Sequence, residues 1–155
     1  MVIDDGDIVR GLGFVSMYSA WVEEDVDDIL RGLNDIEPFT VKVQRWMISR
    51  KLEYSAAIIN NLKSPELIEL PNILRSGVQL FEERNQLIHG RIYAGFDRKD
   101  YVRSGRIGNP VREIISLDLY DLANKFFSYR GELIGPQLFR IPRAVDAELR
   151  RNKGC

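Results

Sequence analysis

Apolar residues return at steps of three and four along most of the chain, which is the spacing of one face of an α-helix. In residues 7–33 this face runs from Ile8 to Leu33 and predicts one long helix, with an acidic start that suits the helix dipole. The acidic run of residues 23–28 is interpreted as a solvated face of this helix. Pro38 then favours a turn over residues 34–38.

Two more helices are expected before residue 90. One covers residues 40–62, and the other runs from about Pro65 to His89, with Pro71 expected to break or kink it near its start. Gly90 is expected to end this third helix in the left-handed conformation that glycine favours. The apolar stripe of the third helix is Leu67, Leu70, Leu74, Val78, Phe81 and Ile88, with Asn85 as its polar member.

The remainder of the chain combines an irregular segment with further helices. Residues 91–115 are rich in glycine and predict a long loop or a small irregular hairpin. A fourth helix is expected from Ser116 to about Ile134, ended by Gly135 and Pro136, and a short amphipathic helix near residues 143–151. These elements predict an all-α fold, an up-and-down bundle of four or five helices. We expect a single domain over residues 1–155, with a core at about 7–135 and a short C-terminal helix and basic tail in 136–155.

Composition narrows the class of protein. With 155 residues, 45% apolar and 29% charged, the chain is typical of a soluble globular domain. No apolar run approaches the roughly 18 residues of a membrane span, and the acidic N-terminus does not resemble a signal peptide. One histidine and one cysteine, Cys155, argue against a zinc site and exclude an internal disulfide. A cytoplasmic protein without metal or cofactor is expected.

Charge is distributed unevenly along the chain. Residues 1–83 carry 8 Lys/Arg and 15 Asp/Glu, whereas residues 84–155 carry 14 Lys/Arg and 8 Asp/Glu. From Arg84 to Arg112, seven basic residues stand against two acidic ones. Such a stretch can collect a polyanion, and it is equally typical of a solvated loop with scattered arginines.

A polar group interrupts the third helix near its end. Asn85 occupies a stripe position where Leu or Ile is expected, so its amide must find a partner or cost about 1–3 kcal/mol. His89 lies one turn further on the same face, and Arg84 is adjacent. Histidine transfers protons near neutral pH, and a guanidinium can stabilise a phosphate. Arg84 and His89 together therefore favour a phosphodiester-cleaving pair that works without a metal.

A structural interpretation of the same residues stays open. Composition and spacing alone favour it, because an arginine and a histidine at this spacing often occur by chance. His89 can satisfy the last carbonyls of the helix, and Asn85 can form a buried hydrogen bond between helices.

The stretch Arg84-Asn85-Gln86-Leu87-Ile88-His89-Gly90 resembles the signature of the HEPN superfamily. That signature is an arginine, a polar residue and then a histidine, with four to six residues between arginine and histidine, and here there are four. The resemblance extends to the order of elements over most of residues 7–135: the motif ends the third long helix, an arginine-bearing loop follows, and Ser116 opens another helix.

The resemblance implies an all-helical homodimer in which the motif helices of two subunits line one cleft. Catalytic members are metal-independent endoribonucleases, often toxins or defence effectors. His89 would then be the general acid or base for attack of a ribose 2′-hydroxyl, Arg84 would bind the scissile phosphate, and Asn85 would orient the site.

Single-stranded RNA is the expected substrate, because its bases can splay and its 2′-hydroxyl is free to react. Its expected contacts are Arg91, Tyr93, Arg98, Lys99, Arg103 and Arg106. The aromatic side chains of Tyr93, Phe96 and Tyr101 can stack on bases, and each can equally well pack the loop onto the bundle.

Other functions are compatible with the same sequence. Toxin members partnered by an antitoxin often carry a tyrosine two residues after the histidine, where this chain has Arg91. An antitoxin or regulatory protein is nevertheless a candidate partner. The main alternative is a non-catalytic dimeric module that binds RNA or protein. A third is a structural protein whose acidic first helix docks on a basic neighbour.

Overall fold

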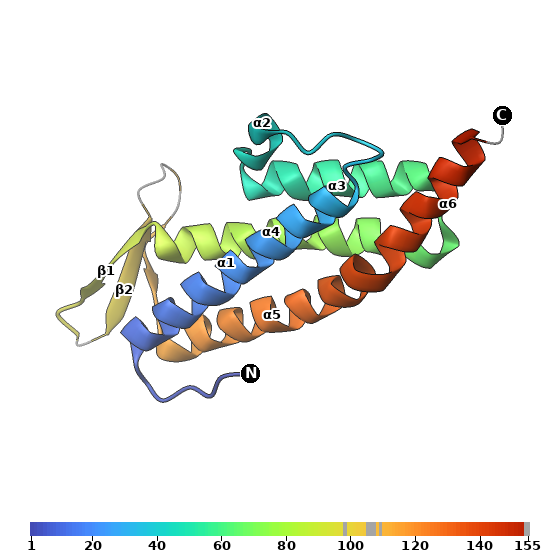
Figure 1. Ribbon diagram of the computed structural model, residues 1–155. Helices are drawn as coiled ribbons and strands as arrows, with labels where there is room; N and C mark the ends of the chain where they lie inside the picture. Colours follow the sequence, from blue (N-terminus) through green and yellow to red (C-terminus); the bar gives the residue numbers. More distant parts are fainter. Residues whose placement is uncertain (98, 105–107, 109, 154–155) are drawn as a thin grey trace. The chain divides into compact units, whose positions relative to one another are not determined.

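The computed structural model describes residues 1–97, 99–104, 108 and 110–153, and these residues are mostly helical with one small sheet (Figure 1). The predicted all-α class with a hairpin after the third long helix is confirmed. The elements in chain order are α1 (Ile8–Gly32), α2 (Val41–Gln44), α3 (Ile48–Leu62), the 3-10 turn η1 (Pro65–Leu67), α4 (Leu70–Ile88), β1 (Gly90–Ala94), β2 (Asp100–Ser104), β3 (Arg112–Glu113), α5 (Ser116–Gly135), the π-helical turn η2 (Pro136–Arg140) and α6 (Ile141–Lys153).

The helix predicted over residues 40–62 is interrupted. The chain forms the single turn α2, leaves helical geometry at Met47, whose backbone is extended, and starts again as α3. The ring of Trp46 explains the break, because it packs edge-on against Tyr54 at 5.2 Å between ring centroids and lies under the guanidinium of Arg50 at 3.7 Å. These contacts fold the turn back onto α3.

The third predicted helix begins later than expected. Pro65 starts a 3-10 turn, and Pro71 lies in the first turn of α4, where a missing N–H breaks no helical hydrogen bond. Gly90 is not left-handed, so the prediction for its backbone is wrong. It opens strand β1, and a Cβ at this position would collide with Cγ2 of Val102. Close approach of β2 is therefore the reason for a glycine here.

The α-helix α5 ends at Gly135, as predicted, but the backbone stays helical beyond it. Residues Pro136–Arg140 form a π-helical turn, and α6 continues to Lys153. Part of the basic tail thus lies in the last turn of α6, where cations interact favourably with the helix dipole.

Contacts divide the chain into two compact units, which are described separately. Unit 1 comprises Met1–Ala20 and Leu80–Phe127, and unit 2 comprises Trp21–Gln79 and Ser128–Cys155. The helices α1, α4 and α5 each contribute to both units.

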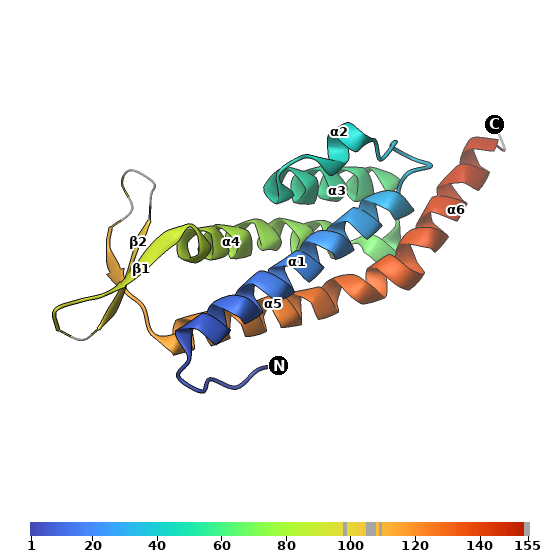
Figure 2. The same ribbon diagram turned by 60° about the vertical axis from the view of Figure 1, so that its left-hand side comes forward.

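Unit 1 packs the starts of α1 and α5 and the end of α4 around aromatic rings. Phe81 of α4 meets Phe126 of α5 edge-on at 5.1 Å between centroids, and Phe14 of α1 meets Tyr120 at 5.8 Å. The three antiparallel strands follow the order β1-β2-β3. Figure 2 shows the β1–β2 hairpin beyond the end of α4. Val102 and Ile114 are buried beneath it, so one face of the sheet belongs to the core.

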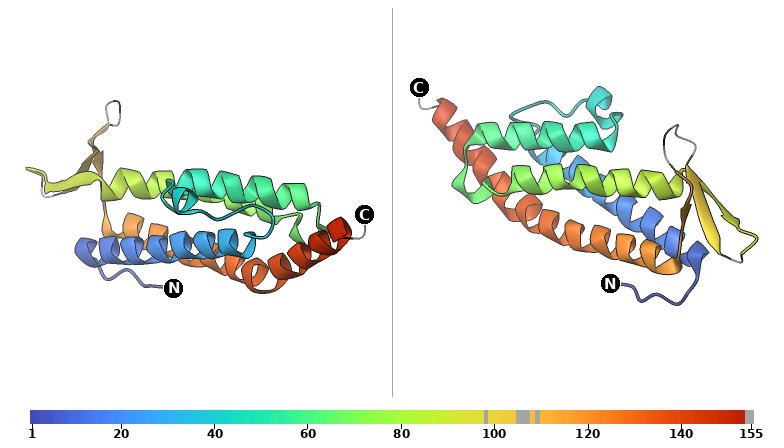
Figure 3. Two further views of the ribbon diagram at one scale, coloured as in Figure 1. Left: turned by 45° about the horizontal axis from the view of Figure 1, so that its top comes forward. Right: turned by 180° about the vertical axis from the view of Figure 1, so that it is seen from behind.

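Unit 2 contains the end of α1, the whole of α2 and α3, the start of α4, the end of α5 and α6. In this unit α3 and α5 run opposite to α4, as expected of an alternating bundle (Figure 1, Figure 3). The end of α1 runs in the same direction as α3, because residues 33–47 carry the chain back to the start of that helix.

The acidic run of α1 is partly buried, so its interpretation as a solvated face is wrong for Asp25 and Asp27. Asp25 is only 6% exposed and accepts a hydrogen bond from Arg130 Nε at 2.8 Å. Asp27 pairs with the buried amine of Lys51 at 2.6 Å. Desolvation raises the pKa of Asp25, against the opposing effect of Arg130.

Candidate functional site

Asn85 lies between Arg84 and His89 in the chain, at the end of α4, and its side chain contacts Arg84. Its side-chain Oδ1 accepts a hydrogen bond from Arg84 Nη1 at 3.1 Å, and its backbone oxygen accepts one from the His89 N–H at 3.3 Å. The first bond draws the guanidinium toward the side of the helix that carries Asn85. At about 100° per residue, Asn85 and a helical residue four positions on share that side, within roughly 40°.

Arg84 lies on the packed side of α4, in line with Gly77 and Phe81. Its side chain is half-buried, and its Nε atom is enclosed by protein. Around an ideal helix Arg84 and His89 are roughly 140° apart. The turn of the arginine toward Asn85 is thus what brings its charge closer to the histidine side.

His89 is exposed and lies just beyond the last residue of α4. Its imidazole makes no hydrogen bond to any residue that the structure describes. The structural explanation in which His89 satisfies the last carbonyls of the helix therefore has no support among these residues. Asn85 is also only half-buried and bonds within its own helix, so it is not a buried link between helices.

The expected apolar stripe of α4 needs a correction. Leu80 and Leu87 are buried, although neither belongs to the predicted stripe, whereas Val78 and Ile88 are only half-buried. Burial of Leu87 turns the opposite side of the last helical turn, with Asn85, toward the surface. Asn85 therefore lies at the edge of the packed face of α4 and not in its middle.

The hairpin places four of the basic and aromatic residues on one outer face of the sheet. Arg91 of β1 is directly opposite Arg103 of β2, and Tyr93 is directly opposite Tyr101. Both arginines are exposed, and the two tyrosine rings are stacked with centroids 6.0 Å apart. Sequence spacing does not predict either pairing, because the partner of a residue across a sheet follows from the register of the strands.

The other residues expected to contact RNA do not lie on this face of the sheet as free cations or stacked rings, or lie outside the described residues. The amine of Lys99 pairs with Glu113 at 2.9 Å, which raises the pKa of Lys99 and neutralises its charge locally. Phe96 is fully exposed, so it does not pack the loop onto the bundle. Arg98 and Arg106 lie outside the described residues.

The hydroxyl of Tyr101 is engaged beside the hairpin turn. It donates a hydrogen bond to Asp97 at 2.7 Å, which lowers the pKa of Asp97 and raises that of Tyr101. This bond fixes the position of the Tyr101 ring at the end of the hairpin.

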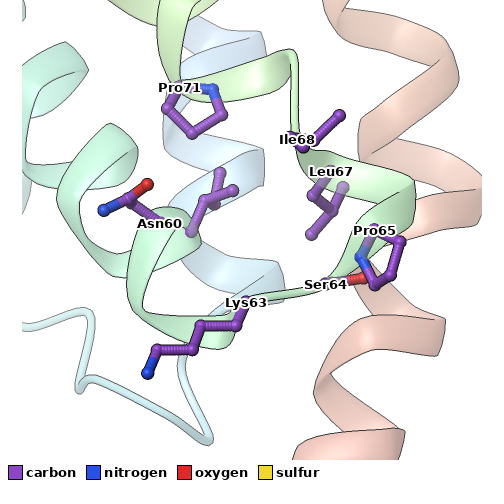
Figure 4. A pocket seen from close by; sticks show the side chains of 8 residues that line it. Asn60, Lys63, Ser64, Pro65, Leu67, Ile68 and Pro71 are labelled. Carbon is purple, nitrogen blue, oxygen red and sulfur yellow. The ribbon is translucent and has the colours of Figure 1, made fainter.

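One cavity lies in unit 2, away from the motif. It has a volume of about 360 Å³ and lies between the end of α3 and the start of α4 (Figure 4). Lys63 is its one ionisable lining residue and points away from Pro65 and Leu67. The cavity therefore offers no acid–base pair.

A second cavity, of about 300 Å³, lies in unit 1 between α4, β3 and α5. From α4 it is lined by Glu83, Gln86 and Leu87, and two of these, Glu83 and Leu87, lie on the side of the helix roughly opposite Asn85. Arg84, Asn85 and His89 are not among its lining residues.

The described residues contain no group of three or more side chains arranged to hold a metal ion. Among the helices of the described part of the chain, none has the length and apolarity needed to cross a membrane. Comparison of the chain with protein-family models, curated proteins and solved structures finds no match.

Proposed function

We propose that this protein is a metal-independent endoribonuclease that cleaves single-stranded RNA at the end of α4. The observation that carries the proposal is the hydrogen bond by which the Asn85 side chain holds Arg84 Nη1, one helical turn before the exposed imidazole of His89. A fixed cation and an exposed imidazole without a structural partner among the described residues are the two groups that phosphodiester cleavage requires.

In the proposed reaction, His89 removes the proton of a ribose 2′-hydroxyl, and the oxygen attacks the neighbouring phosphorus. Arg84 stabilises the negative charge that develops on the phosphate oxygens, since its planar guanidinium can donate two parallel hydrogen bonds. The bond to the 5′-oxygen breaks and that oxygen gains a proton. The products are a 2′,3′-cyclic phosphate and a 5′-hydroxyl.

The proposal includes a homodimer. Asn85 and His89 lie on an open surface rather than in a cavity, and a second copy of the chain would supply the missing wall and the second imidazole. Proton donation to the leaving oxygen could then come from the partner's histidine. The resemblance of Arg84–His89 to the HEPN motif supports the same arrangement. A toxin or defence role is part of this proposal.

The test is cleavage of a labelled single-stranded RNA in EDTA. His89→Ala is expected to lower the rate by about 10²–10⁴-fold, the usual contribution of a positioned acid or base. Arg84→Lys keeps the charge but loses the planar fork, so it should also lower the rate. Gln86→Ala is the matched control, because Gln86 is an exposed polar residue of the same helical turn that is not part of the proposed site. Undiminished cleavage by His89→Ala would refute the assignment.

A second candidate function is RNA binding without cleavage. The outer face of the sheet favours it, because Arg91 and Arg103 lie exposed beside the stacked tyrosines independently of the α4 motif. This function predicts salt-sensitive RNA binding and no cleaved product, with His89→Ala behaving like the unaltered protein.

A further inference from the structure

The outer face of the β1–β2 hairpin juxtaposes two like charges. Arg91 and Arg103 are directly opposed in the register, and directly opposed residues on neighbouring strands have Cβ atoms about 5 Å apart. Like charges in this position destabilise a sheet. Neither guanidinium forms an ion pair with a carboxylate of the described residues. A ligand with negative charge between them would remove the repulsion.

The neighbouring pair on the same face is aromatic. Tyr93 and Tyr101 are two positions along the same strands, so their side chains lie on the same side of the sheet as the arginines, about 7 Å further along. Tyr93 is 44% exposed, and the hydroxyl of Tyr101 is held by Asp97. The pair is therefore a fixed platform with an accessible ring.

Two carboxylates flank this face, and each is engaged. Glu113 is opposite Tyr101 in the sheet and pairs with Lys99. Asp97 accepts the Tyr101 hydroxyl. Lys99 therefore neutralises Glu113, whereas Asp97 keeps its negative charge at the hairpin turn, beyond the tyrosine pair and away from the two arginines.

We propose that this face binds one nucleotide unit of single-stranded RNA, with a backbone phosphate between Arg91 and Arg103 and a base stacked on Tyr93. Guanidinium groups bind phosphate through paired hydrogen bonds, and base stacking on an aromatic ring is tolerant of sequence. This inference rests on the proposed function in taking RNA as the ligand. It assigns substrate binding to the sheet and the cleavage step to α4.

The test measures the affinity of a labelled single-stranded RNA for the full chain carrying His89→Ala, so that the RNA stays intact. Adding Arg91→Ala and Arg103→Ala should weaken binding at least tenfold and reduce the slope of log affinity against log salt by about 0.7, because one phosphate is no longer neutralised. Lys42→Ala with Arg150→Ala removes two exposed cations from unit 2 and is the control of equal charge. It should leave the affinity within twofold.

The aromatic contact has its own matched pair of variants. Tyr93→Ala should weaken binding by about tenfold, whereas Tyr93→Phe keeps the ring and should bind like the parent. Circular dichroism of each variant checks that the fold is retained. Arg91→Lys with Arg103→Lys keeps both charges and should bind RNA more tightly than the double alanine variant.

The outcomes separate the two proposals. Cleavage that depends on His89, together with RNA affinity that is indifferent to both arginines, overturns the sheet proposal and leaves the nuclease. Affinity that depends on the arginines and Tyr93, without cleavage by the unaltered chain, supports the sheet proposal and refutes the nuclease. An equal loss in the Lys42 and Arg150 control overturns the sheet proposal, because the effect would then be one of net charge alone.

Discussion

Gly77 is the position at which packing in unit 2 leaves no room for a side chain. A Cβ there would collide with the hydroxyl of Tyr129 and would lie 2.8 Å from its Cζ and 3.2 Å from Cδ1 of Leu52. Tyr129 is 6% exposed and donates its hydroxyl to the backbone oxygen of Leu74 at 3.2 Å. Burial raises the pKa of Tyr129, so the hydroxyl stays protonated at neutral pH.

We therefore expect Gly77→Ala to destabilise the protein although alanine favours helix. Overpacking costs about 2 kcal/mol, and loss of the Tyr129 hydrogen bond costs about 1 kcal/mol. The higher helix propensity of alanine relative to glycine offsets about 1 kcal/mol of this cost. The net loss is about 2 kcal/mol, which lowers Tm by about 4–8 °C for a chain of this size.

Urea unfolding followed by circular dichroism measures this loss. Gly131→Ala is the matched control, because Gly131 lies inside α5 with nothing within 4 Å of the added Cβ, and it should stabilise the protein by about 0.5–1 kcal/mol. Adding Tyr129→Phe to Gly77→Ala removes the nearest atom, so the two changes together should cost about 1 kcal/mol less than their sum. If Gly77→Ala is as stabilising as Gly131→Ala, the packing argument is wrong.

Three further predictions concern other positions. Gly90→Ala should destabilise unit 1 by about 1–3 kcal/mol, because its Cβ would overlap the buried side chain of Val102, and unfolding of this variant equal to the unaltered protein would contradict that. Burial raises the pKa of Asp25, so protonated Asp25 contributes to the free energy of unfolding below pH 3.8, and this contribution is lost as the pH rises through the raised pKa. The stability of Asp25→Asn relative to the unaltered protein should therefore increase over that pH interval, which urea titrations at successive pH values measure. The Tyr120 hydroxyl holds the pKa of Asp5 below 3.8, so ionised Asp5 stabilises the fold above pH 3.8, and this stabilisation is lost as the pH falls through the lowered pKa. Tyr120→Phe should therefore lose less stability than the unaltered protein over that pH interval. Equal losses would exclude the hydrogen bond as the cause.

The location of the candidate site could be predicted from sequence because its residues are close together in the chain. Arg84, Asn85 and His89 fall within two helical turns, and helical periodicity alone places them at the end of the third long helix. The long helices were predictable for the same local reason. The break at Met47 was not, since it depends on where Trp46 packs, whereas Pro71 already indicated the interruption near the start of the third helix.

The buried charged residues could not be predicted from the helical periodicity of the sequence either. Asp25 and Arg130 are 105 residues apart in the chain, and nothing in either local pattern indicates that they pair. Five carboxylates within residues 23–28 are typical of a solvated helix face. Only packing of α5 against α1 within unit 2 makes Asp25 an internal residue.

The sequence by itself determined the helical class, the extent of α1 and the presence of an arginine, an asparagine and a histidine at one helix end, because each depends on neighbours within a few positions. The tertiary structure alone decided which groups face each other across the hairpin. A shift of the register by one residue would send Arg91 and Tyr93 against different partners, and register is set by the packing of Val102 against Gly90 and the core. The opposed arginines and stacked tyrosines therefore follow only from the tertiary structure, whereas the motif of α4 can be predicted from the sequence.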